Sequence, residues 1–130
     1  MITASRLLLP LGLALLTACA RQPSSLIVQQ QSQCPLRLYS GQQVVLTLPS
    51  NPTTGYRWTL QDSAKDVLHS LGPEVYSNPE DAGLVGSAGQ STWRFQTIRA
   101  GEGHLLLTYQ RPWEPEVAPA QTFDCRLQVK

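Results

Sequence analysis

The sequence predicts an all-β domain, built as an antiparallel β-sandwich of about seven to eight short strands. Apolar and polar residues alternate along several stretches, which is the period of a strand with one buried face. Nine glycines and ten prolines in 130 residues supply many turns. Only 15% of the residues are charged, so long solvated helices are not expected, while a hydrophobic content of 42% is enough for one core.

The alternation is clearest near the C-terminus, where Phe123, Cys125, Leu127 and Val129 are separated by polar residues. One face of this segment therefore belongs to the core, and Cys125 points into it. Residues 67–77 could form one interrupted strand or two. Further strands are expected at residues 36–39, 44–48, 56–60, 91–98 and 103–110. This number of short strands, with turns between them, is typical of an immunoglobulin-like sandwich.

The N-terminus has the pattern of an export signal. One basic residue, Arg6, precedes an apolar run at residues 7–16, which is too short to span a bilayer. The run ends in the motif LTAC at residues 16–19, which resembles the lipobox of bacterial lipoproteins. The alternative is an ordinary secretory peptide that is cleaved near Ala18 or Ala20.

In a lipoprotein of this kind the lipobox cysteine is acylated and becomes the new N-terminus, so Cys19 is the expected lipidation site. Two or more acyl chains hold a protein stably on a membrane, where one chain does not. Ala20 follows, and the absence of aspartate there favours the outer over the inner membrane of the bacterial envelope. We therefore expect a signal peptide at residues 1–18, the lipidated cysteine and a tether at 19–33, and the sandwich at 34–130.

Cys34 and Cys125 remain once Cys19 is set aside. An even pair of cysteines in an exported chain predicts a disulfide, which here would close nearly the whole domain into one loop. A reactive cysteine would need His69 or His104 as its base, and neither lies in a catalytic sequence context. The spacing of these residues is not that of a zinc site, so no metal or cofactor is expected.

The charge balance argues against nucleic acid as a partner. The ten basic residues include Arg6 of the leader, which leaves nine basic against nine acidic residues. Such a chain lacks the basic footprint of a nucleic-acid-binding protein. Motifs of serine, zinc and paired-carboxylate hydrolases are also absent from the sequence, so an enzyme is not expected. We expect a monomer whose partner is another protein or a small molecule.

Three segments between the expected strands stand out. Taken singly, each has an ordinary interpretation: a hairpin turn, a glycine-rich connection, or a tryptophan packed on the rim of the sandwich under an arginine. The first segment combines a proline that fixes its backbone with a glycine that permits positive φ. The segments are Asn51-Pro52-Thr53-Thr54-Gly55-Tyr56, Gly86-Ser87-Ala88-Gly89, and Arg111-Pro112-Trp113, which continues to about residue 121.

The order of strands predicts where these segments lie. If each strand crosses the sandwich once and residues 67–77 count as a single crossing, two crossings separate each segment from the next. All three loops would then emerge at the same end of the domain. That end would carry a rigid turn, a glycine-lined backbone and a stiffened Trp113 beside Arg111. Tryptophan and arginine are enriched at the hot spots of protein interfaces, so the pattern favours a preorganised binding surface.

The three segments resemble the signature loops of the chagasin family, which are immunoglobulin-like inhibitors of papain-family cysteine proteases. The resemblance covers roughly residues 36–129 and includes the order and spacing of the loops. The first and third motifs are complete. The second departs from the Gly-x-Gly-Gly pattern of the family, because Ala88 stands at its third position.

The resemblance implies a reversible, competitive inhibitor that occludes the protease cleft with three loops. The first loop would lie over the catalytic Cys–His pair, with Thr54 near the nucleophile. Arg111 and Trp113 would contact the primed side of the cleft, and the glycine loop would contact the opposite wall. The target would be a papain-family cysteine protease, either the cell's own enzyme or a host's.

Two other functions fit an exported lipoprotein with a small sandwich domain. It could inhibit another hydrolase, such as lysozyme, or it could bind an envelope partner during assembly. The match of all three loops argues against the first alternative, and the second predicts a stable envelope partner and no protease inhibition.

Overall fold

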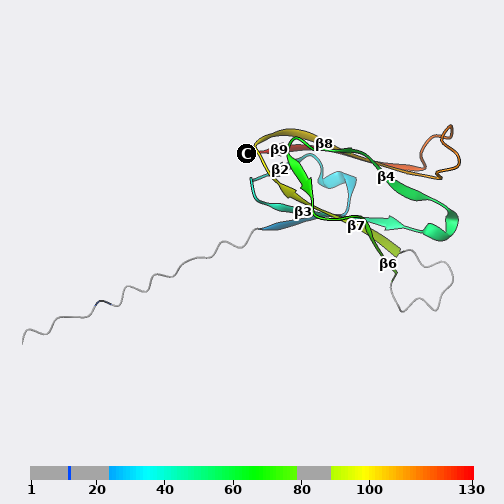
Figure 1. The fold of residues 1–130 in the computed structure, drawn as a ribbon, viewed down its shortest axis with the longest axis horizontal. Helices are drawn as coiled ribbons and strands as arrows, with labels where there is room; N and C mark the ends of the chain where they lie inside the picture. The colour runs from blue at the N-terminus through cyan, green and yellow to red at the C-terminus, as the bar shows by residue number, and fades with distance from the viewer. Residues whose placement is uncertain (1–11, 13–23, 79–88) are drawn as a thin grey trace, which may run out of the picture.

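The structure is a computed structural model that describes residue 12, residues 24–78 and residues 89–130. The expected signal peptide, Cys19, and Gly86, Ser87 and Ala88 of the glycine loop lie outside the described residues. The described residues form nine strands in two sheets that pack face to face (Figure 1). Among them there is no helix long and apolar enough to cross a membrane.

The two sheets differ in size. The five-stranded sheet contains, in order, β1 (Ser25–Val28), β3 (Gln43–Ser50) and β7 (Gly89–Thr97), with β5 (Leu68–Ser70) and β6 (Val75–Ser77) both paired to the far side of β7. The four-stranded sheet has the order β2 (Leu36–Leu38), β9 (Gln121–Val129), β8 (Gly101–Gln110) and β4 (Arg57–Ser63). Two 3-10 turns, η1 (Gln31–Gln33) and η2 (Pro52–Thr54), complete the fold.

The core lies between the sheets and is formed by the strand faces that the sequence predicts to be buried. Alternate residues of β3, β7, β8 and β9 point inward, and their polar neighbours point outward. Burial of these apolar side chains is the main force that holds the two sheets together. The inward residues of these four strands include Val44, Leu46, Leu48, Trp93, Phe95, Leu105, Leu107, Tyr109, Phe123, Cys125, Leu127 and Val129.

Residues 67–77 make one interrupted crossing of the sandwich. β5 and β6 both run antiparallel to β7, with Leu68 opposite Thr97 and Val75 opposite Thr92. Between them the backbone N–H of Leu71 donates a hydrogen bond of 2.9 Å to the carbonyl of Arg94, which keeps the chain on β7 across the break. This arrangement satisfies the condition under which all three loops emerge at one end.

The structure confirms the expected all-β sandwich and differs from the expectation in three details. The described residues contain nine strands rather than seven or eight, because the crossing at residues 67–77 is split and β1 is added. The sandwich is not wholly antiparallel, since β1 pairs parallel to β3 and β2 pairs parallel to β9. Residues 25–33, expected as part of the tether, instead form β1 and η1, and Val28 is buried in the core. The run of three apolar residues in β1 is too short to show a strand period.

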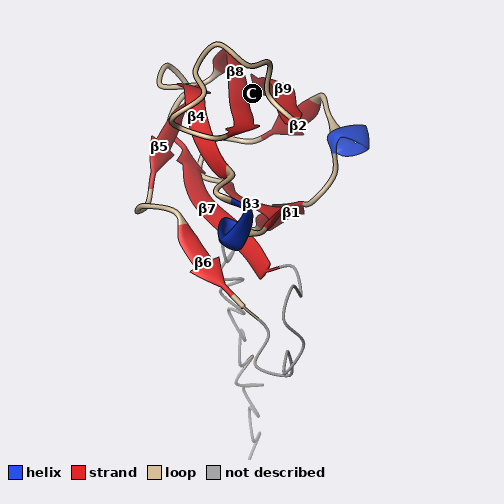
Figure 2. Ribbon diagram, turned by 90° about the vertical axis from the view of Figure 1, so that its right-hand side faces the viewer, coloured by secondary structure: helices blue, strands red, loops and turns tan. Residues whose placement is uncertain are grey.

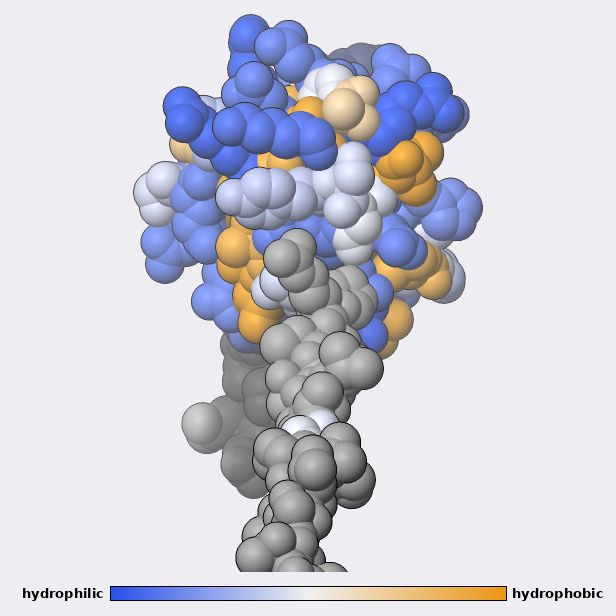
Figure 3. All heavy atoms as spheres, turned by 90° about the vertical axis from the view of Figure 1, so that its left-hand side faces the viewer, coloured by the Kyte–Doolittle hydropathy of each residue, from blue (hydrophilic) through white to orange (hydrophobic). Residues whose placement is uncertain are grey.

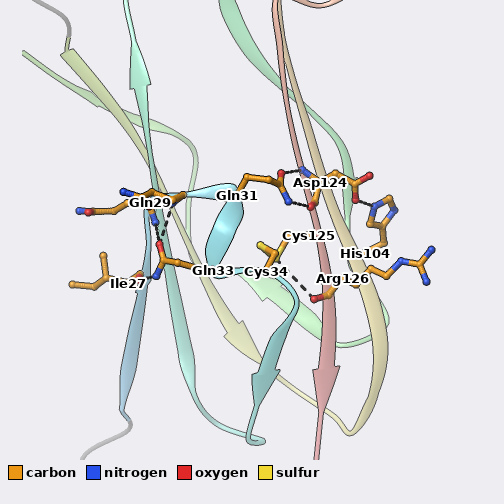
Figure 4. The surroundings of a disulfide bond; sticks show 10 residues. Ile27, Gln29, Gln31, Gln33, Cys34, His104, Asp124, Cys125 and Arg126 are labelled. Atoms are coloured by element: carbon orange, nitrogen blue, oxygen red, sulfur yellow. Dashed lines mark hydrogen bonds and ion pairs between the residues drawn. A yellow bond between two sulfur atoms is a disulfide. The ribbon is translucent and has the colours of Figure 1, made fainter.

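The predicted disulfide between Cys34 and Cys125 is present, with its two Cα atoms 5.3 Å apart (Figure 4). It ties the chain that leaves η1 to β9, where Cys125 is fully buried. The side chain of Gln31 reinforces the same junction. Its amide donates to the carbonyl of Asp124, and its oxygen accepts from the Asp124 backbone N–H at 2.7 Å. The N-terminal segment is therefore held to the four-stranded sheet by one covalent and two polar contacts.

Replacement of Cys34 and Cys125 together by alanine should lower the free energy of unfolding by about 4 kcal/mol, because the bridge closes a loop with a sequence separation of 91. Urea denaturation followed by tryptophan fluorescence measures this change. Wild-type protein under reducing conditions should shift by a similar amount. A shift below about 1 kcal/mol in both samples would show that the bridge does not restrain the unfolded chain in this way.

Candidate functional site

The strand register places the first loop, the third loop and the strand ends that flank the glycine loop at one end of the sandwich (Figure 1). Ser50, the last residue of β3, pairs with Gly89, where β7 begins, so the first loop starts beside the end of the glycine loop. On the other sheet, Arg57 at the start of β4 pairs with Gln110 at the end of β8. The first loop therefore ends beside the start of the third loop.

The first loop lies in the middle because it alone passes from one sheet to the other. It connects β3 of the five-stranded sheet with β4 of the four-stranded sheet. β6 and β7, between which the glycine loop lies in the sequence, belong to the first of these sheets, and β8 and β9, which flank the third loop, belong to the second. Seen end-on, η2 lies between the β8–β9 loop and β6 (Figure 2). The central position that the family resemblance implies for this loop thus follows from the topology.

Asn51 organises the first loop. Its side-chain oxygen accepts hydrogen bonds from the backbone N–H of Thr53 at 3.2 Å and from the Thr53 hydroxyl. Its backbone carbonyl accepts from the Thr54 hydroxyl at 2.7 Å. Asn51 is thus the N-cap of η2, and Pro52 occupies the first turn, where a missing N–H costs nothing. The loop is a closed turn with Thr53 and Thr54 exposed at its apex.

Gly55 ends η2 in the left-handed conformation, with φ of 83°. This confirms the positive φ that the sequence predicts for it. A second constraint acts on the same residue, because a Cβ placed on Gly55 would overlap the indole ring of Trp113. Any side chain at this position would therefore both strain the backbone and displace the tryptophan.

Aromatic contacts hold the first loop on the core. The backbone N–H of Asn51 donates to the hydroxyl of Tyr109 at 2.9 Å. The Tyr109 ring stacks on Tyr56 and on Trp58, with centroid distances of 5.2 and 4.8 Å. Trp58 in turn donates its indole N–H to the carbonyl of Pro49 at 3.0 Å. Both ends of the loop are thus fixed to the same buried aromatic group.

The third loop packs against the first. The Arg111 guanidinium lies over the ring of Tyr56, 4.6 Å from its centroid, and its Nε donates to the carbonyl of Thr54 at 3.2 Å. Trp113 covers Gly55 with one part of its ring, yet the residue remains 65% exposed. Arg111 is therefore engaged within the protein itself, and Trp113 is presented to solvent on a glycine support.

Of the glycine loop, only Gly89 lies within the described residues. Gly89 is buried at the start of β7, next to Ser50. The site thus unites the first loop, the third loop and the strand end at which the glycine loop returns.

Tyr109 also belongs to this site, although the sequence pattern predicts only that it lies in a strand. The available signal was its position two residues before Arg111, on the inward face of β8. A buried tyrosine at a strand end usually finds a partner for its hydroxyl, and the neighbouring loop is the nearest source of free N–H groups.

Thr53, Thr54 and Trp113 are all exposed at the loop end. A hollow of about 650 Å³ lies elsewhere, on the four-stranded sheet, where its lining includes Arg37, Asp62, His104 and Arg126. No group of three or more metal-ligating side chains is found among residues 24–78 and 89–130. An exposed tryptophan that packs on a neighbouring loop is a candidate anchor for a partner protein.

Comparison with known proteins identifies the kind of binding protein. Residues 37–127 match the family described as chagasin family peptidase inhibitor I42. This match covers more than half of the sequence, and the chain belongs to the chagasin family. Chagasin of Trypanosoma cruzi is 30% identical over 105 residues, which span 79% of this chain and 96% of chagasin.

Solved structures share the fold. A cysteine protease inhibitor from Entamoeba histolytica superposes with a TM-score of 0.69 at 20% identity, over 82% of this chain and 96% of that protein. The inhibitor PbICP-C, solved in complex with falcipain-2, superposes with a TM-score of 0.55 at 17% identity, over 84% of this chain and 93% of its own. At these identities the likeness is one of fold. The relatives lend no support to lysozyme inhibition or to a role in envelope assembly.

Gly55→Ala should lower the free energy of unfolding by about 1–2 kcal/mol, because alanine is strained at positive φ, and it should displace Trp113. The Trp113 indole N–H resonance in an NMR spectrum reports the displacement. Gly41→Ala is the matched control, since Gly41 has φ of 87° but no heavy atom within 4 Å of a Cβ placed on it. It should show the same loss of stability with the Trp113 resonance unmoved. Equal effects of both substitutions on that resonance would contradict the packing of Trp113 on Gly55.

Proposed function

We propose that the three loops enter the active-site cleft of a papain-like cysteine protease and inhibit it reversibly and competitively. The observation that carries this proposal is the mutual support of two loops, in which Arg111 stacks on Tyr56 and Trp113 packs on Gly55. Loops already held in one conformation lose little entropy on binding. The exposed indole can then supply buried contact area as an anchor in the cleft.

The first loop is built to occupy a cleft without being cleaved. The backbone N–H of Gly55 donates to the carbonyl of Pro52 at 3.0 Å, and that of Thr54 donates to the carbonyl of Asn51 at 3.3 Å. A turn closed by its own hydrogen bonds does not lie in a cleft as an extended peptide. Thr54 would therefore approach the catalytic cysteine without presenting a peptide bond in the geometry of a substrate.

Arg111 has a different role in this proposal from the direct protease contact that the family resemblance implies. Its guanidinium is directed at Tyr56 and its Nε at Thr54, within the inhibitor. It would act on the protease mainly by fixing the carbonyl of Thr54 at the apex of the first loop. Trp113 would make the direct contact on that side of the cleft.

Trp113→Ala should raise the inhibition constant for papain by about tenfold or more, because an interface anchor loses its burial. Steady-state titration of purified protein against papain with a fluorogenic substrate measures the constant. Tyr39→Ala is the control, since Tyr39 is 68% exposed against 65% for Trp113 but lies at the opposite end of the sandwich. We expect no change for this control.

An unchanged inhibition constant for Trp113→Ala would remove Trp113 from the binding surface. Absence of inhibition by folded wild-type protein, against papain and related enzymes, would refute the proposed function itself.

We also propose that Cys19 carries a lipid anchor and that the protein is held in the bacterial envelope, at the outer membrane. The support is the LTAC motif at residues 16–19 after a short apolar run, with Ala20 in place of an aspartate. The tether would then be the short segment between Cys19 and Ser25, where β1 begins.

Cys19→Ser should release the protein from the membrane fraction of a bacterial host, because a serine cannot take the thioether-linked lipid. Fractionation followed by mass measurement of the N-terminal peptide tests this. The mass of the wild-type peptide should include acyl chains. Recovery of an unacylated wild-type peptide in the soluble fraction would favour an ordinary secretory signal.

A further inference from the structure

The edge strand β6 carries an aromatic residue that neither the sequence analysis nor the three loops include. Tyr76 lies in the middle of this three-residue strand, opposite Ser91 of β7. Its neighbour Val75 is 61% exposed, whereas Tyr76 is 41% exposed. The tyrosine is therefore partly covered although it belongs to a strand at the sheet edge.

The residue that covers it is Gly89. A Cβ placed on Gly89 would lie 2.6 Å from Cζ of Tyr76 and would also overlap the hydroxyl oxygen and Cε2. Gly89 is not among the glycines with positive φ, so its backbone does not require glycine. The phenol ring occupies the space that a side chain at this position would need.

The contact lies at the junction of two loops. Gly89 begins β7 and pairs with Ser50, which directly precedes Asn51 of the first loop. Ser77, next to Tyr76, ends β6 and pairs with Gln90. The Tyr76 ring thus lies against the start of β7, at the residue that pairs with Ser50. It forms the counterpart of Trp113, whose ring covers Gly55 on the other side.

We propose that Tyr76 is a positioning residue for protease inhibition. Its ring, seated on Gly89, sets the start of β7 beside Ser50, the residue from which the first loop begins. This inference rests on the proposed function and extends the determinants of inhibition from the three loops to the edge strand β6.

A double-mutant cycle on Tyr76 and Gly89 tests the proposal, with the inhibition constant for papain and the dissociation rate as readouts. Tyr76→Ala should raise the inhibition constant about fivefold or more, mainly through faster dissociation. Tyr76→Phe should remain within about twofold of wild type, because the ring stays on Gly89. Gly89→Ala should weaken inhibition by expelling the ring. The double variant should be weakened by less than the product of the two single effects, since no ring is left to expel.

Leu71→Ala is the control for a loosened sheet edge. Leu71 is 43% exposed against 41% for Tyr76, and it lies on the same edge between β5 and β6. It should lower the melting temperature about as much as Tyr76→Ala and leave the inhibition constant unchanged. Equal loss of inhibition in Leu71→Ala, additive effects in the cycle, or full inhibition by Tyr76→Ala would each overturn the positioning role. Failure of wild-type protein to inhibit would overturn the proposed function together with it.

Discussion

The hydroxyl of Tyr109 accepts a hydrogen bond from the backbone of Asn51, and the placement of the loop surface depends on this contact. Tyr109 belongs to the buried face of β8, so the position of the first loop is fixed relative to the core. The Tyr109 ring stacks on Tyr56, and the guanidinium of Arg111 lies over the ring of Tyr56. The Nε of Arg111 then donates a hydrogen bond to the carbonyl of Thr54. The loop end is thus a stack of side chains that begins inside the sandwich and ends at the exposed threonines.

Glycine has two distinct uses in this surface. At Gly55 it permits both a left-handed backbone and the close approach of an indole ring, whereas at Gly89 the backbone is ordinary and only the approach of a phenol ring matters. In both places the absent side chain lets an aromatic ring approach the main chain closely. Such contacts rigidify a loop without long side chains, whose ordering would oppose binding through lost rotamer entropy.

Much of the fold could be predicted because one face of each long strand is buried, which imposes the alternation seen around Leu105, Leu107 and Phe123. The common end of the three loops followed from counting crossings. The parallel strand β1 could not be predicted, because its four residues show no period and its partner is distant in sequence. The hydrogen bond between Tyr109 and the first loop joins residues 58 positions apart. No local pattern in the sequence predicts a contact over such a separation.

The parallel pairing of β1 with β3 has a geometric consequence for a tethered protein. Ser25 pairs with Gln43 at the start of β3, while the loops follow Ser50 at its end, so the chain enters at the pole opposite the loops. Figure 3 views that pole, which is largely hydrophilic with scattered apolar residues. The six residue steps from Cys19 to Ser25 span at most about 20 Å, and the eight residues of β3 add about 26 Å. With the proposed anchor, the loop end would point away from the bilayer and could reach roughly 50 Å from the membrane surface. The effective concentration of the inhibitor would then be high only for proteases within that distance of the membrane.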